Sequence, residues 1–302
     1  MKTYLILISN APQMGVYHKA LGDKLKHEGY NVIYAFSDYL PIFTYELNLS
    51  EEKYYVFSDY FKQHKGNIIL NEEFNDLNLW KTFFCDYDRT IVHHHRKIFK
   101  KDYYENLLKN LINFFDEIFK KDQIDLFIYE NISNSFVYTC FEVAKRKGIE
   151  FRGYVGSRLT NRFEMHTEEF GIRNQFKHKF ENINLDSIDQ HIINEIDLYL
   201  QKYSGDIIPS YHSKKSLLSA NYSLLKRYFK KDKIEYLKGA IKFSIFEKGK
   251  FKYAYQIMNP FSGYFNLFKH QIIKKVRTKF ANKYFSKIDY EDDFFLFPLH
   301  MK

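Results

Sequence analysis

Short apolar runs alternate with amphipathic stretches along the first part of the chain. The runs suit strands buried on both faces of a sheet, and they occupy residues 4–8, 31–36, 125–129 and 150–155. Apolar side chains at helical spacing predict helices between them, most clearly over residues 102–120 and 135–147. We therefore expect an α/β fold: a doubly wound, mostly parallel Rossmann-like sheet in which these four strands are neighbours, with helices on both faces.

The rest of the chain is less regular. Residues 39–96 are polar and aromatic, with short strands expected at 54–57 and 67–70, and a helix is expected at 187–203. These patterns predict three units: a Rossmann-like domain (1–210), a basic aromatic helical segment (211–288), and a linker with the first strand of another domain (289–302). Because a domain rarely ends on a strand without a partner, we expect the chain to be one half of a longer protein.

Polar residues follow three of the predicted strands. Because the carboxyl ends of parallel strands meet at one edge of a sheet, we expect these residues to converge on one cleft, although polar residues are also common in ordinary loops. Glu130 follows an apolar strand, so a raised pKa is expected and it is a candidate catalytic base. His18, with an ordinary pKa near neutrality, is the second candidate. The candidates for binding substrate are Asn10, Gln13, Asn131, Ser157, Arg158 and Arg162, with Asn134 nearby.

Composition and charge indicate the cellular compartment of the protein and the partners it could bind. The chain has only two cysteines, without metal-ligand spacing, and no apolar run approaches the roughly 20 residues of a membrane span, so we expect a cytosolic protein. Residues 221–287 hold 17 Lys and Arg against 3 Asp and Glu, interleaved with Phe and Tyr. Three interpretations remain open: binding to an anionic membrane surface, binding to nucleic acid, or a solvated face over an aromatic core. No recognisable nucleic-acid module is present, so we expect no nucleic-acid partner.

The end of the chain resembles a motif of bacterial capsule and surface-polysaccharide biosynthesis proteins. Residues 293–300 read DFFLFPLH, and in those proteins an apolar strand runs into Phe-Pro-Leu-His or Phe-Pro-Leu-Gln, usually followed by Pro-Glu. Residues 156–163 are similar to an Arg-containing segment that follows a central strand there. The opening is similar too, through His18, Leu21, Leu25, Gly29, Tyr30 and Val32.

This resemblance implies the acceptor-side domain of a GT-B glycosyltransferase, with His300 at the start of the second domain. Such an enzyme would transfer a sugar from a nucleotide-activated donor to a glycan or lipid-linked acceptor, without a metal or other cofactor, at the inner face of the cytoplasmic membrane. The chain ends before any Pro-Glu, and the missing donor domain puts independent activity in doubt. The alternative from another class is a non-catalytic subunit that binds a membrane surface or a glycan.

Two further motifs suggest a metal. Asp86 and Asp88 match the DxD pattern of the other large glycosyltransferase class, in which two carboxylates hold a divalent cation. The pattern is frequent by chance, and we favour Asp88 and Arg89 as an ion pair at the rim of the cleft or as contacts to the acceptor substrate. Residues 93–95 are three histidines, but adjacent side chains diverge on a helix or a strand, so they cannot close one site. We expect no metal and read this tract as a cationic face.

Overall fold

In the computed structural model, one open sheet forms the centre of the molecule. The structure describes residues 1–8, 10, 14–64, 68–84, 86, 101–156, 163–168, 174–184, 187–203, 230–257, 259–281 and 283. The strands are β1 (Thr3–Ile8), β2 (Asn31–Phe36), β3 (Lys53–Val56), β4 (Leu126–Tyr129), β5 (Glu150–Gly156) and β6 (Phe163–His166). They lie in the order β3-β2-β1-β4-β5-β6.

All neighbouring strands are parallel except β5 and β6, which are antiparallel. The four strands predicted from apolar runs are therefore confirmed as parallel neighbours, and the short strand expected near residue 54 is β3. The chain builds outward from β1 through β2 to β3, then returns to the other side of β1 with β4. The space between β1 and β4 is thus the switch point of the sheet, where such folds bind ligands.

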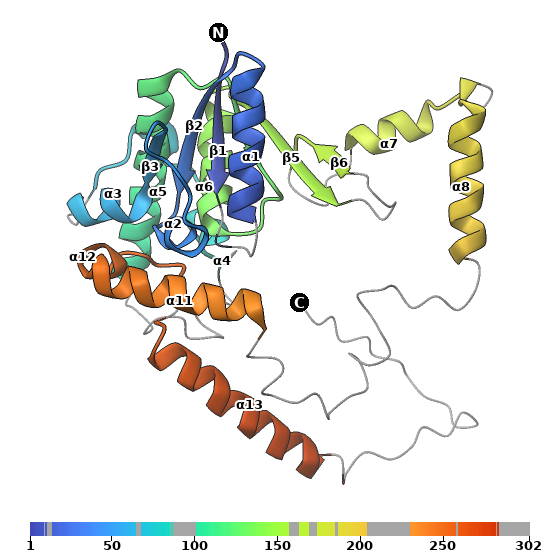
Figure 1. Cartoon of the computed structure of the whole chain (residues 1–302). Helices are drawn as coiled ribbons and strands as arrows, with labels where there is room; N and C mark the ends of the chain where they lie inside the picture. Colours follow the sequence, from blue (N-terminus) through green and yellow to red (C-terminus); the bar gives the residue numbers. More distant parts are fainter. Residues whose placement is uncertain are drawn as a thin grey trace.

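Helices cover both faces of this sheet, as expected (Figure 1). On one face, helix α1 (Met14–His27) packs against Ile6 and Ile8 of β1. On the other face, α5 (Lys101–Asp122) and α6 (Ser135–Arg146) pack against Leu5 and Leu7. Alternate residues of one strand thus enter two separate cores, which is why the run from Leu5 to Ile8 is apolar throughout.

The sequence patterns did not predict several short elements correctly. Residues 68–70 form no strand, so that prediction was wrong, and Asn67 lies outside the described residues. In the described part of the chain between β2 and α5 lie four short helical elements: α2 (Leu40–Tyr45), α3 (Phe57–Gln63), the 3-10 turn η1 (Glu72–Phe74) and α4 (Leu79–Phe84). Each is too short to show a full amphipathic repeat. Beyond β6 lie α7 (Asn174–Glu181) and α8 (Gln190–Tyr203), the latter close to the helix predicted over 187–203.

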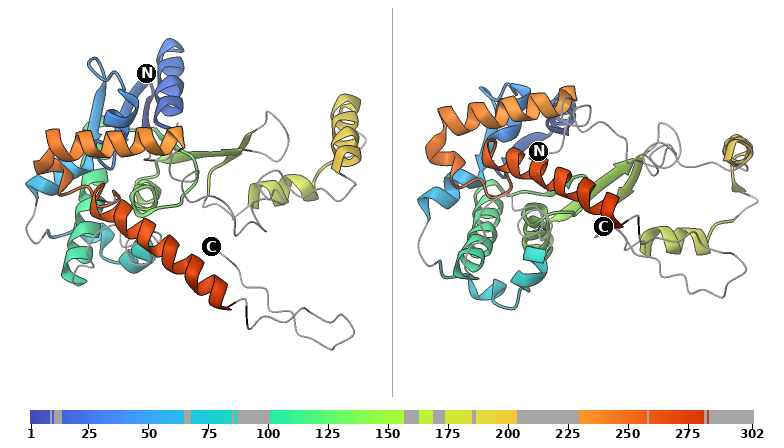
Figure 2. Two further views of the ribbon diagram at one scale, coloured as in Figure 1. Left: turned by 60° about the horizontal axis from the view of Figure 1, so that its bottom comes forward. Right: turned by 90° about the horizontal axis from the view of Figure 1, so that it is seen from below.

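The described part of the basic segment contains the helices α11 (Lys231–Phe246), α12 (Lys248–Phe251) and α13 (Ser262–Ala281). Helix α11 packs on α2, where Ala240 and Phe243 are buried with Leu40, while α13 extends away from the sheet (Figures 1 and 2). Part of the predicted second unit therefore packs directly on the first. Among the described helices, none is both long enough and apolar enough to span a membrane.

Candidate functional site

The carboxyl edge of the sheet brings together residues that follow three different strands. Asn10 comes after β1, and its side-chain amide donates a 3.0 Å hydrogen bond to Asp38, which comes after β2. Asp38 is completely buried and also accepts from the Ser37 hydroxyl at 3.0 Å and the Leu40 amide at 2.9 Å. This carboxylate thus holds Asn10 in place and accepts a hydrogen bond from the first amide of α2. The Asn10 side-chain oxygen is buried without a hydrogen-bond partner among the described residues.

Glu130 and Asn131 follow β4, on the other side of the switch point from Asn10. Both side chains are half-buried, so they are partly open to solvent. The Tyr154 amide donates a 2.9 Å hydrogen bond to the Glu130 carbonyl, which fixes the Glu130 backbone to β5. Two of the predicted clusters, those after β1 and after β4, therefore flank the β1–β4 switch point.

His18 differs from its prediction. The side chain is completely buried between α1 and the sheet, with its ring stacked on Tyr129 and its Nε2 2.6 Å from the Tyr154 hydroxyl oxygen. Burial lowers the pKa of His18 from 6.5 to about 4. The expected pKa near neutrality is therefore wrong, because an apolar helix–sheet interface disfavours the charged imidazolium. Its Nδ1 has no hydrogen-bond partner among the described residues.

Aromatic rings open to solvent next to this buried histidine. Tyr17 is 40% exposed and Phe163 is 60% exposed, with ring centroids 6.5 Å apart. Both lie against Tyr154, whose ring centroid is 5.3 Å from that of Tyr17 and 6.2 Å from that of Phe163. Burial raises the pKa of the Tyr154 hydroxyl, and the nearby Tyr17 and Glu130 raise it further. The hydroxyl therefore remains protonated at neutral pH.

A buried polar cluster closes the carboxyl edge beside α6. Asp86 is 2% exposed and accepts hydrogen bonds from the amide and the hydroxyl of Ser135, the first residue of α6. A carboxylate at a helix N-terminus is stabilised by the free amides and the helix dipole. Asn134 caps the same helix by accepting from the Val137 amide at 3.1 Å. Because the Asp86 carboxylate already binds the start of α6, it is poorly placed to bind a metal ion as the DxD pattern would require.

The cluster continues into residues 231–257, which we name the crossing segment because it lies along the carboxyl edge. The Gln256 amide donates to Asp86 and to the Asn134 side-chain oxygen, each at 3.3 Å. The Tyr255 hydroxyl lies 2.8 Å from that of Ser135. These contacts fasten the end of the crossing segment to the start of α6.

Lys250 fastens the crossing segment to the other side of the sheet. Its ammonium lies 4.3 Å from the ring centroid of Tyr39 and 3.8 Å from Asp59. The Tyr39 hydroxyl donates to Asp59, so one lysine contacts the chain that follows β2 and the chain that follows β3. The crossing segment therefore covers part of the edge at which ligands bind in this fold class.

The remaining predicted residues lie outside the described part of the chain. They are Gln13, Asp88, Arg89, Ser157, Arg158, Arg162 and His300, together with the three histidines at 93–95. Sequence patterns missed the contributions of Asp38, Tyr154 and Gln256. Asp38 carried a usable signal, since it follows a predicted strand, whereas nothing local distinguishes Gln256.

Two other features contribute little chemistry. Among the described residues, no cluster of three or more His, Cys, Asp or Glu side chains could hold a metal ion. A cavity of about 210 Å³ lies away from the carboxyl edge, bordered by α4, α5 and α6. Its charged lining residues are Asp76, Glu142 and Arg146; Arg146 is paired with Asp76 at 2.7 Å, and Thr139 donates to the Ser135 carbonyl.

The strand order and switch point are those of a Rossmann-like fold. Such folds host many unrelated activities. Comparisons with protein-family models, with curated proteins and with solved structures found no match to this chain.

Proposed function

We propose that this chain is the acceptor-side domain of a GT-B glycosyltransferase of capsule or lipopolysaccharide biosynthesis. The observation that carries the proposal is the position of Glu130, a half-buried residue that follows β4 beside the β1–β4 switch point, with Asn10 following β1 on the other side. The motif resemblance at residues 293–300 supplies the class of reaction. The substrates would be a nucleotide sugar and a glycan or lipid-linked acceptor.

In this proposal Glu130 acts as the base. Its carboxylate accepts the proton of an acceptor hydroxyl, and the hydroxyl oxygen bonds to the anomeric carbon of the donor sugar. The bond from that carbon to the phosphate oxygen breaks, and the nucleotide leaves with the electron pair. A cationic or helix N-terminal site on the second domain would stabilise the departing phosphate. Asn131 would orient the acceptor through amide hydrogen bonds.

The exposed rings of Tyr17 and Phe163 suit the acceptor side of this reaction. Binding sites for small molecules combine aromatic surface with a few oriented polar groups. Here the rings lie next to Tyr154, which contacts Glu130 through its backbone. A sugar ring stacked on Tyr17 would therefore lie close to the proposed base.

The test is sugar transfer by the product of the complete reading frame, with a panel of labelled nucleotide sugars and membrane glycolipids as acceptors. Glu130→Gln should lower kcat at least about 100-fold, since a general base contributes about 10²–10⁴. The matched control is Glu150→Gln at the amino end of β5, on the opposite edge of the sheet. No transfer by the wild-type product with any donor would refute the enzyme proposal. Transfer that Glu130→Gln leaves unchanged would reassign the base.

A non-catalytic glycan-binding subunit is the second candidate. The crossing segment covers part of the carboxyl edge, and His18 is too deeply buried to act on a solvent-borne substrate. This alternative predicts glycan binding that Tyr17→Ala weakens, with no transfer from any nucleotide sugar. Binding and transfer measured on the same preparation therefore separate the two candidates.

A further inference from the structure

Helix α13 carries an exposed apolar stripe. Its large apolar residues recur at spacings of three and four, which places them on one side of a helix. Five of these residues form a stripe in which each is at least 43% exposed, namely Phe265, Phe268, Ile272, Val276 and Phe280, and Ile273 beside them is half-buried. Figures 1 and 2 show that the helix starts beside the sheet domain and extends away from it. Asn259 caps its start by accepting from the amides of Phe261 and Ser262, each at 3.0 Å.

The charge of α13 has one sign only. Residues 262–281 contain no Asp or Glu. They contain five lysines and arginines, all exposed: Lys269, Lys274, Lys275, Arg277 and Lys279. Lys269 and Lys279 fall among the apolar positions, where long alkyl stems can lie along an apolar surface while the ammonium groups reach polar surroundings.

Two other helices show that this combination is particular to α13. Helix α11 belongs to the same basic segment, but it buries Ala240 and Phe243 in the protein core and carries two acidic residues. Helix α8 also exposes apolar side chains, including Leu198 at 66%, but it carries Glu195 and Asp197. Among these three helices, only α13 combines an exposed apolar stripe with basic residues and contains no acidic residue.

We propose that α13 lies on the surface of an anionic lipid bilayer, with its aromatic and aliphatic side chains in the headgroup boundary. Basic side chains are attracted by the negative surface potential, and apolar side chains add a contribution that salt does not screen. A second copy of this chain fits less well, because a symmetric contact would oppose five cations with five cations. Nucleic acid would satisfy the charge but would leave the aliphatic Ile272 and Val276 in water. The inference is independent of the proposed transfer reaction.

The experiment is sedimentation of the full chain with vesicles, over a salt series. One set contains phosphatidylglycerol and the other only phosphatidylcholine. We expect binding to the anionic vesicles that falls at least about tenfold as salt rises, since the Debye length drops from about 10 Å at 0.1 M to about 3 Å at 1 M. A smaller fraction of the protein should remain bound to the anionic vesicles at high salt.

Two variants of α13 test the two contributions separately. Lys274→Gln with Lys275→Gln and Arg277→Gln should lower binding at low salt about tenfold or more. Phe265→Ser with Phe280→Ser should remove the salt-resistant fraction. These side chains are exposed, so circular dichroism should confirm an unchanged fold. The matched control replaces three exposed lysines elsewhere in the segment by glutamine: Lys231, Lys238 and Lys248.

Four outcomes would overturn the inference. The first is no binding of the wild-type chain to anionic vesicles. The second is an equal loss of binding in the α13 charge variant and in its control. The third is full retention by the phenylalanine variant at every salt concentration together with equally tight binding of duplex DNA, which would indicate a general polyanion site. The fourth is vesicle binding that appears only when Glu291, Asp292 and Asp293 are neutralised. That result would indicate that the chain's own acidic stretch, and not a bilayer, is the partner of α13.

Discussion

The Tyr154 hydroxyl oxygen lies 2.6 Å from Nε2 of His18, in the buried interface between the sheet and its first helix. The two residues are 136 positions apart, and their contact joins α1 to β5. The buried imidazole is neutral because its pKa is lowered to about 4. This contact thus makes the packing of α1 on the sheet sensitive to acid.

We predict that acid destabilises the wild-type protein through His18. Unfolded histidine has a pKa of about 6.5, so between pH 6.5 and 4 the unfolded state binds a proton that the folded state does not. The free energy of unfolding should therefore fall as the pH falls through this window, by up to about 3 kcal/mol. Denaturant unfolding of wild type and His18→Gln across the window measures the difference. The exposed His27→Gln should keep the wild-type slope, and equal slopes for all three proteins would contradict the prediction.

Gly22 of α1 should not tolerate a side chain. A Cβ atom there would lie 2.0 Å from the Tyr34 hydroxyl oxygen and 2.8 Å from the ring carbon that bears it. Tyr34 is completely buried and cannot move aside, so Gly22→Ala should lower the free energy of unfolding by about 1–3 kcal/mol despite the better helix propensity of alanine.

Tyr34→Phe supplies the control for Gly22. The Tyr34 hydroxyl has no hydrogen-bond partner among the described residues, so Tyr34→Phe alone should be close to neutral or stabilising. Combined with Gly22→Ala it should recover part of the lost stability, because the nearest clashing atom is gone. Thermal unfolding of the four proteins forms a double-mutant cycle, and strict additivity would show that the two positions do not contact each other.

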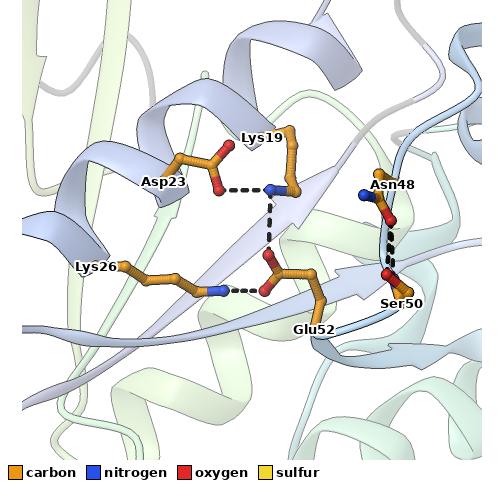
Figure 3. Close-up of polar contacts among 6 residues, drawn as sticks. All are labelled: Lys19, Asp23, Lys26, Asn48, Ser50 and Glu52. Atoms are coloured by element: carbon orange, nitrogen blue, oxygen red, sulfur yellow. Dashed lines mark hydrogen bonds and ion pairs between the residues drawn. The ribbon is translucent and has the colours of Figure 1, made fainter.

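Glu52, which directly precedes β3, should stabilise the attachment of α1 to this side of the sheet (Figure 3). Its side chain is 9% exposed and accepts from Lys26 and, at 3.1 Å, from Lys19. Burial opposes the charge on Lys19, but the carboxylates of Asp23 and Glu52 outweigh it and raise the pKa of Lys19. Glu52→Gln should therefore cost about 1–3 kcal/mol of unfolding free energy.

The exposed pair of Lys24 and Glu28 provides the comparison for Glu52. Lys24 lies in the last turn of α1 and Glu28 directly follows the helix; their N–O distance is 3.5 Å, and their side chains are 69% and 48% exposed. Glu28→Gln should change the stability by less than about 0.5 kcal/mol, since water screens the pair. Urea unfolding of both variants decides the matter, and similar losses would mean that burial does not strengthen the Glu52 contacts.

Gln256 should hold the crossing segment on the carboxyl edge. Its amide lies 3.3 Å from an oxygen of the buried Asp86, so Gln256→Glu would oppose two carboxylates at that distance. We expect faster amide hydrogen exchange over residues 247–257, with a smaller effect in Gln256→Met, which loses the hydrogen bonds without adding charge. Mass spectrometry of the exchanged peptides gives the ranking, and equal exchange in all three proteins would show that this contact does not fasten the segment.

Part of the candidate site followed from local sequence. Asn10, Glu130 and Asn131 were found because polar residues that follow buried parallel strands must lie on one edge of the sheet. The burial of His18 was not predicted in this way. Its position in α1 was predicted, but whether that face met solvent or Tyr154 depended on a strand more than a hundred residues away.

The sequence by itself determined that the four central strands are parallel neighbours and that the long helices α5 and α6 lie between them, because apolar runs and helical repeats are local patterns that only a two-faced sheet can bury. It also determined the excess of positive charge after residue 221. Only the tertiary structure decided which basic helix turns its apolar side chains inward and which leaves them exposed, and that Gln256 meets Asp86 at the start of α6. Such pairings are set by shape and burial between distant segments, and a single side chain carries no local signal of the partner it will meet.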